Sequence, residues 1–372
     1  MLLISVICIS FDRVQNRPMA DVCRKFKSMS YADKTYKNIL YQNQEDSCSI
    51  KNYDIKTDNN EGLMQYNYVR WMVGYQKNLT LSTDLTVQNN ALYCSIYSAS
   101  INSIIHYPSS RMKCYSQNAY KGCSTSNLAM SSSSEPTPIR APHFVMQLLD
   151  DYIKGRPFDK LGHRRWMLSP HTVQTMFGTT LKTTKWRSFT MYNYYFTMST
   201  FDTGCVVRTP PETLPFYAWP PPGYVHKDHV YNIFSFSADN LQNPNIQVKV
   251  DGATQRTQKI FAAPSSYLPP SVSFTFNGVE NLVGKKVEVK VTSGSTTWEY
   301  TIYPVDCSTW TTTDPENPEN PELNQPKKPV NPLSIALPIC TIVIVIIAVV
   351  VTIYFMKKHK DAGDQPDTTT EV

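Results

Sequence analysis

The chain has 372 residues, a formal net charge of +6 and 26 prolines against only 13 glycines. This length is enough for more than one domain. Apart from one short basic flank, Lys and Arg are scattered, so the charge indicates a solvated, slightly basic surface and no nucleic-acid partner.

The N-terminal stretch MLLISVICIS is apolar but too short to span a bilayer, and it lacks a basic region before the apolar core. We interpret residues 1–12 as a short secretory signal peptide, with a mis-started N-terminus as the alternative. Residues 22–60 are polar and are expected to be irregular.

Three segments have the apolar period of helices. They are EGLMQYNYVRWMVGYQ from residue 61, TVQNNALYCSIYSASINSII from residue 86, and HFVMQLLDDYI over 143–153. Asp84 or Ser82 is expected to cap the second helix. Residues 107–127 between the second and third helices are expected to form a loop.

After residue 163 the pattern changes to β-branched and aromatic residues separated by turns, which predicts strands. The segments concerned are RRWMLS, QTMFGTTL and WRSFTMYNYYFTM. Helices followed by strands favour an α+β first domain, which we place at 22–215. It would end near a proline-rich hinge, LPFYAWPPPGYV (214–225).

Strict alternation of apolar and polar residues marks the next region. In KKVEVKV the three valines face one way and the intervening Glu288 and Lys290 face the other. Asp251-Gly252 and Asn277-Gly278 are hairpin-type turns. Short strands at this spacing predict a small β-sandwich over 224–308.

The C-terminal part has the composition of a membrane anchor. A Pro- and Glu-rich stalk over 309–332 leads into residues 333–355, which are 23 residues without a charge. As a helix they would reach about 35 Å, enough to span a bilayer. The basic KKHK that follows predicts a type I plasma-membrane protein with its ectodomain outside and a cytoplasmic tail, 356–372. The terminal TTEV, ending at Val372, matches a weak PDZ-binding pattern that also arises by chance.

The cysteines and one sequon fit an external location. Of nine cysteines, Cys8 and Cys340 lie in the apolar segments, and the other seven would lie in an oxidising compartment. Because seven is odd, at least one is free or pairs between chains. Asn78-Leu79-Thr80 is a glycosylation sequon. The candidate disulfide pairs are Cys114–Cys123, Cys23–Cys48 and Cys205–Cys307.

Two histidines are candidates for a cleft. His106 follows the second helix and His163 opens HRRW, so the two could converge on a divalent cation such as zinc or calcium, with Asp150 or Asp151 adding a carboxylate. Zinc sites usually need three or four protein ligands, and adjacent carboxylates are also common on solvated helix faces.

Nucleophilic catalysis is not indicated. Serines are frequent near Ser124 and Ser126, but neither a G-x-S-x-G elbow nor a papain-like C-G-S-C-W segment occurs. Arg164 and Arg165 could bind an anion, although arginine beside tryptophan more often stacks or pairs structurally. The remaining histidines show no pattern and are expected on the surface or in loops; they are His143, His171, His226 and His229.

Five segments in register resemble the CAP (SCP-like, cysteine-rich secretory protein) superfamily, and most nearly its bacterial-type branch. They are YNYVRWMVGYQ, HYPSSRMKC, SNLAMS, LLDDYI and LGHRRWMLSP, within residues 60–240. YAWPPPGYV is similar to the piece that leads into a small β domain there.

The resemblance implies an α-β-α sandwich with a cleft in which two histidines face each other, at the positions of His106 and His163. Many members add two glutamates to the cleft. Here Ser126 stands at one of those positions, and Asp150 or Asp151 lies near the other. Replacing a carboxylate by a hydroxyl weakens metal affinity and general-base capacity.

The expected fold class is therefore α+β: a CAP-type α-β-α sandwich followed by a small β-sandwich, a stalk and one transmembrane helix. The expected function is that of a non-enzymatic cell-surface protein that binds an extracellular protein or lipid partner, in adhesion or host interaction. The alternatives are a hydrolase of peptide or cell-wall material and a lipid- or sterol-binding module.

Overall fold

The computed structural model describes residues 14–29, 41–42, 48, 55–135, 139–151, 161–186, 189–263 and 269–311. The predicted signal peptide 1–12, the stalk beyond residue 311, the apolar segment 333–355 and the tail ending at Val372 lie outside these residues.

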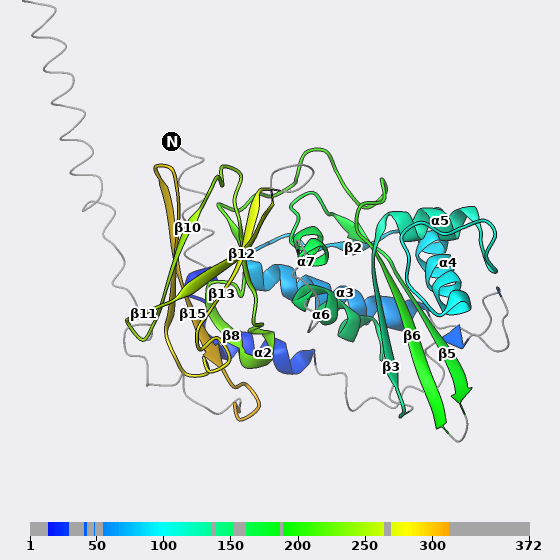
Figure 1. The fold of residues 1–372 in the computed structure, drawn as a ribbon, viewed down its shortest axis with the longest axis horizontal. Helices are drawn as coiled ribbons and strands as arrows, with labels where there is room; N and C mark the ends of the chain where they lie inside the picture. The colour runs from blue at the N-terminus through cyan, green and yellow to red at the C-terminus, as the bar shows by residue number, and fades with distance from the viewer. Residues whose placement is uncertain are drawn as a thin grey trace, which may run out of the picture. The chain divides into compact units, whose positions relative to one another are not determined.

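A four-stranded sheet with helices on both faces forms one part of the described chain (Figure 1). Its strand order is β1-β5-β6-β3, with β1 parallel to β5 and the other pairs antiparallel. The elements of this part are α3 (Ile55–Val73), β2 (Thr80–Leu81), α4 (Leu85–Ile101), α5 (Gln117–Ser124), β3 (Ser126–Ser133), α6 (Ala141–Asp150), α7 (Gly162–Met167), β4 (Gln174–Thr175), β5 (Phe177–Trp186) and β6 (Phe189–Ser199), with β1 (Tyr41–Gln42) at the sheet edge.

Alternation along β5 determines which helix each residue meets, because successive side chains of a strand point to opposite faces. The hydroxyl of Thr180 lies 2.8 Å from that of Ser95 on α4. The hydroxyl of Thr179 instead donates to Asp58 on α3 at 2.7 Å. On this second face, Phe196 of β6 stacks against Phe144 of α6.

A β-sandwich forms the other part. A five-stranded sheet, β11-β10-β14-β15-β8, packs on a four-stranded sheet, β12-β13-β9-β7, and Phe236 of β9 contacts the rings of Trp298 and Tyr300 on β15. The strands are β7 (Tyr217–Trp219), β8 (Gly223–His226), β9 (Phe234–Ser237), β10 (Asn245–Val250), β11 (Ala253–Gln255), β12 (Thr257–Ala263), β13 (Ser271–Phe276), β14 (Val287–Ser293) and β15 (Thr296–Val305), with a short 3-10 turn η1 (Lys227–His229).

The alternation predicted for the sandwich strands is confirmed. All three valines of β14 are buried, whereas Lys290 is exposed. Asp251-Gly252 forms the expected hairpin between β10 and β11, with both residues at positive φ. Asn277-Gly278 is not a hairpin, because β13 pairs with β9 and β12 while β14 lies in the other sheet.

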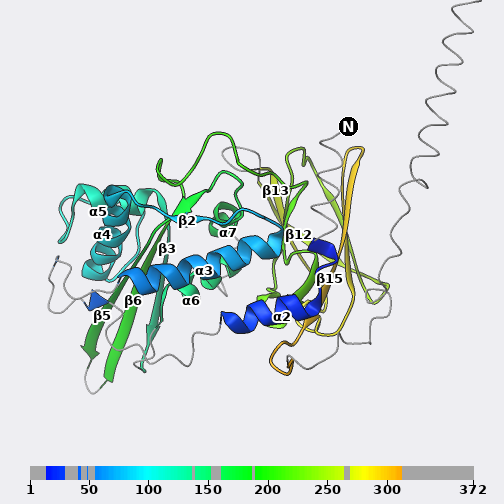
Figure 2. The same cartoon turned by 180° about the vertical axis from the view of Figure 1, so that it is seen from behind.

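One long helix connects the two parts. Near its start, α3 accepts the bond from Thr179 of the first sheet, and near its end the hydroxyl of Tyr68 meets His229 of the sandwich (Figure 2). A further helix, α2 (Met19–Ser28), lies against β8. The polar stretch from residue 22 was expected to be irregular, and this expectation is wrong for α2.

Three other expected elements differ from the structure. Residues 162–167, which overlap the expected strand RRWMLS, form the helix α7, and residues 117–124 of the expected loop form α5. The expected hinge at 214–225 contains the buried strand β7 and part of β8. Trp219 within it is fully buried, because its ring packs in the core and its Nε1 donates to the carbonyl of His229.

The expected fold class is wrong as stated. The described residues form an α+β molecule of mixed helices and several sheets, and the CAP fold is not confirmed. Among these residues no helix combines the length and the apolar character needed to cross a membrane.

The disulfides differ from every expected pair. The bonds are Cys23–Cys307, Cys48–Cys114 and Cys94–Cys123, and Cys205 is free and buried. The physical reason is that pairing needs Cα atoms a few ångströms apart, which depends on tertiary neighbours and not on closeness in sequence.

We expect Gly178→Ala to lower the free energy of unfolding by about 2–3 kcal/mol, because a crowded core cannot accept the added carbon. A Cβ there would lie 2.3 Å from the backbone oxygen of Ala91 on α4. Gly162→Ala is the matched control, since nothing lies within 4 Å of its added Cβ. Urea unfolding of the full-length chain measures both, and equal stabilities would contradict the packing of α4 on β5.

Candidate functional site

His163 is held in place by Asp151, the residue that follows α6. One carboxylate oxygen of Asp151 lies 2.7 Å from Nδ1 of His163, and the other accepts the backbone N–H of His163 at 3.0 Å. Asp151 can reach both because its φ of 53° turns the chain sharply after the helix. A carboxylate only accepts, so Nδ1 of His163 donates to it, and Nε2 is the ring nitrogen that Asp151 does not engage. The side chain of His163 is 34% exposed, so its ring is accessible.

His106 lies in the loop after α4 and is exposed. Its Nδ1 donates to the carbonyl of Cys123, in the last turn of α5, at 2.9 Å. Four residues further on, the carboxamide of Asn127 donates to the carbonyl of His163 at 3.2 Å. The structure therefore brings both histidines against one short segment, 123–127, but in the described residues the two rings share no hydrogen bond or ring contact.

Neither Ser126 nor Asp150 completes a metal site. Ser126 is fully buried at the start of β3, and its hydroxyl has no hydrogen-bond partner among the described residues. Asp150 is half-buried, and burial raises the pKa of its carboxyl. In the described parts of the chain, no three His, Cys, Asp or Glu side chains form a group that could hold a metal ion. These residues do not fit zinc or calcium.

Arg164 is a structural residue and not an anion site. It is fully buried, and its guanidinium donates to the carbonyls of Leu149 (2.6 Å), Asp150 (2.8 Å) and Ile233 (2.7 Å). Burial lowers its pKa to about 10, so it stays charged at neutral pH. The arginine thus joins the end of α6 to the sandwich just before β9.

Trp166, three residues after His163 on the same helix, forms the wall of a largely apolar pocket. Its ring stacks on that of Phe201 with centroids 4.6 Å apart. The pocket has a volume of about 690 Å³. Its other walls include Val206, Val207, His171 and Arg208. Val206, Val207 and Arg208 were not identified from the sequence, where the short apolar pair Val206-Val207 was a local signal, and His171 was expected on the surface or in a loop.

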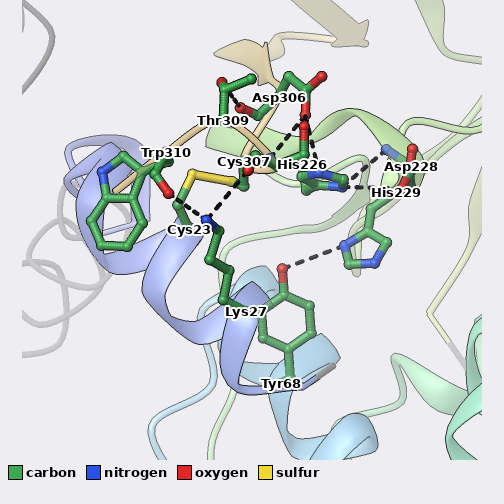
Figure 3. The surroundings of a disulfide bond; sticks show 11 residues. Cys23, Lys27, Tyr68, His226, Asp228, His229, Asp306, Cys307, Thr309 and Trp310 are labelled. Carbon is green, nitrogen blue, oxygen red and sulfur yellow. Dashed lines mark hydrogen bonds and ion pairs between the residues drawn. A yellow bond between two sulfur atoms is a disulfide. The ribbon is translucent and has the colours of Figure 1, made fainter. Parts of the chain in front are cut away.

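A second cluster surrounds the Cys23–Cys307 disulfide (Figure 3). His226 stacks on Phe26 of α2, with ring centroids 3.5 Å apart, and lies 3.9 Å from a carboxylate oxygen of Asp306. His229 lies 3.4 Å from the hydroxyl of Tyr68. Both histidines were expected on the surface or in loops, and both are buried.

The disulfide cluster joins chain segments that are far apart in sequence. Lys27 of α2 donates to the carbonyl of Trp310, and its ammonium also lies 5.8 Å from the centre of the Trp310 ring (Figure 3). Lys227 pairs with Asp306 at 2.5 Å on the outside. The polar groups of the disulfide cluster hold α2 to the sandwich, so we assign the cluster a structural role.

Comparisons with protein-family models, with curated proteins and with solved structures found no match to the chain.

We expect Arg164→Met to lower the free energy of unfolding by about 3 kcal/mol, because it leaves buried carbonyls without donors. Arg165→Met is the matched control. That neighbour is only partly buried, and its Nη2 makes one long bond of 3.4 Å to Pro269, so a loss of 1 kcal/mol or less is expected. Chemical denaturation checks both variants, and a larger effect at Arg165 would contradict the assignment.

We expect the protein to lose stability in mild acid through His229. Burial lowers the pKa of its ring to about 3 from an ordinary 6.5. Between these two pH values the unfolded chain binds a proton on this ring and the folded chain does not. The full stability is present above pH 6.5 and falls as the pH drops from 6.5 towards 3, by up to about 1.4 kcal/mol per pH unit. His229→Gln should make this slope shallower by about that amount in denaturation curves recorded between pH 6 and 4. An unchanged slope would rule out His229 as the source.

Proposed function

We propose that the chain is a disulfide-stabilised extracellular binding protein that acts without covalent catalysis. The observation that carries this proposal is the open pocket lined by the stacked rings of Trp166 and Phe201, since ligand sites are usually preformed, mostly apolar concavities with a few polar groups. Close by in sequence, His163 is oriented by Asp151 but belongs to no metal-binding group among the described residues. The apolar pocket, together with a histidine that belongs to no such group, supports ligand binding better than hydrolysis.

The extracellular setting is supported by the covalent chemistry. Three disulfides within the described residues are typical of an oxidising compartment. Asn78 of the sequon is exposed in the loop before β2, where a glycan would not meet the core. The five segments that resemble the CAP superfamily are consistent with this role, and membership of that superfamily is part of the proposal.

A lipid-binding module is the second candidate, and the lining of the same pocket favours it. The walls formed by Trp166, Phe201, Val206 and Val207 suit an apolar chain, and the exposed Arg208 suits an anionic head group. The volume of about 690 Å³ lies within the range that holds small-molecule ligands.

We expect Phe201→Ala to weaken binding of the full-length chain to intact cells by tenfold or more, because a large aromatic wall of the pocket is lost. Phe189→Ala is the matched control, since Phe189 is 61% exposed on β6 and does not line the pocket. Protease-treated cells separate a protein partner from a lipid. Displacement of the fluorescent fatty acid cis-parinaric acid tests the lipid directly.

The hydrolase alternative is tested in the same preparation. Turnover of a peptide or cell-wall substrate that disappears in His163→Ala would contradict the proposed function. Equal cell binding by the parent chain and both phenylalanine variants would contradict the assignment of the pocket.

A further inference from the structure

A second pocket lies between the starts of two helices and a turn of the chain. It has a volume of about 500 Å³, and its walls come from the first turns of α4, from α5 and from residues 202–204. Neither His106 nor His163 lines this pocket. Its polar walls include Asp84, Asn90, Gln117, Asn118, Lys121 and Asp202.

The walls offer both donors and acceptors. Asp84 and Asp202 supply carboxylates, Gln117 and Asn118 supply carboxamides, and Lys121 supplies an ammonium group. A carboxamide both donates and accepts, a carboxylate only accepts and an ammonium only donates. This mixture complements a ligand whose own groups do both.

One polar atom at this pocket lacks a partner. Asn90 is 2% exposed, and its Oδ1 has no hydrogen-bond partner among the described residues. Asn90 itself lines the pocket, and its Nδ2 lies 3.4 Å from a carboxylate oxygen of Asp202, another wall residue. Buried acceptors are almost always satisfied, so this one indicates a donor supplied from the pocket.

The walls are held rigidly before any ligand arrives. The Cys94–Cys123 disulfide joins α4 to α5, one turn beyond Asn90. The two helices also meet at Gly122, where an added Cβ would lie 1.9 Å from the backbone oxygen of Asn90. Such preorganisation reduces the entropy lost when a ligand binds.

Charge and composition narrow the ligand class. Two carboxylates against one ammonium disfavour phosphate and other anions. A calcium ion takes six to eight oxygen ligands, and the nearby ammonium of Lys121 would repel it. A hydroxyl group donates and accepts at once, so several hydroxyls on one ring can satisfy Asn90, Asn118 and the carboxylates together.

We infer that this pocket binds a neutral polyhydroxylated ligand, that is, a sugar ring of an extracellular glycan. The inference rests on the proposed function in taking the chain to be an extracellular binding protein, and it adds a ligand class and a separate site. Thr203 lines both this pocket and the aromatic pocket of Trp166 and Phe201, so a longer glycan could extend from one to the other.

The test uses the full-length chain on an array of neutral glycans, followed by titration with the methyl glycoside of the best-bound terminal sugar. We expect Asn90→Leu and Asn118→Ala each to weaken binding at least tenfold, because a site built to bond hydroxyls loses affinity when a partner is removed. Asn89→Leu is the matched control, an exposed asparagine beside Asn90 that does not line the pocket, and should change affinity less than twofold. Asn118 is partly exposed, so its variant keeps the test valid if Asn90→Leu fails to fold.

Three results would overturn the inference: no neutral glycan bound, glycan binding that neither pocket variant weakens, or heat on titration with calcium chloride that Asp84→Asn abolishes. Cell binding through Phe201 is measured independently. If it persists while the array shows no binding, the sugar site is wrong and the proposed function stands.

Discussion

The buried guanidinium of Arg164 is the contact on which the site depends. It donates to the carbonyls of Leu149, Asp150 and Ile233, and the nearby carboxylates of Asp151 and Asp150 favour its charged form. These carbonyls come from the end of α6 and from the sandwich, so one side chain fixes α7 against both parts of the molecule. Because His163 precedes Arg164 and Trp166 follows it two residues later on the same short helix, the orientation of the histidine and of the aromatic wall follows from where the arginine is held. A buried charge without hydrogen-bond partners is costly, so the position of α7 depends on these carbonyl contacts being made.

Two local patterns were predicted correctly from the sequence, and the isolated short elements were not. The alternating valines of β14 and the Asp84 cap, which accepts the N–H of Thr86 at 2.8 Å, are local regularities. The six residues of α7 are too few to show a helical period, and their geometry is imposed by the bonds of Arg164. The same reason applies to α2, which is stabilised by the sandwich through Phe26 and the Cys23–Cys307 bond. Isolated helices this short are marginal without such packing.

Part of the candidate site was also predictable. His106 and His163 were identified from the sequence, and both contact the segment 123–127. The choice between Asp150 and Asp151 was left open, and in the structure it is the carboxylate of Asp151 that contacts His163. The pockets could not have been found in the same way. Asn90 and Asp202 are separated by 112 residues in the chain, and only the packing of α4 beside the turn after β6 brings them together.

That turn links the two pockets physically. Asp202 accepts the backbone N–H of Gly204 at 3.1 Å, which fixes the turn, while Thr203 between them lines both pockets. Cys205 follows directly, fully buried, and burial together with the charges of Asp202 and Asp84 raises the pKa of its thiol to about 12. A thiol is nucleophilic only as the thiolate, so Cys205 is inert at neutral pH even where the other described cysteines are oxidised. The turn is therefore held by packing and hydrogen bonds and not by a disulfide at Cys205. Thr203 within this turn forms part of the walls of two adjacent pockets.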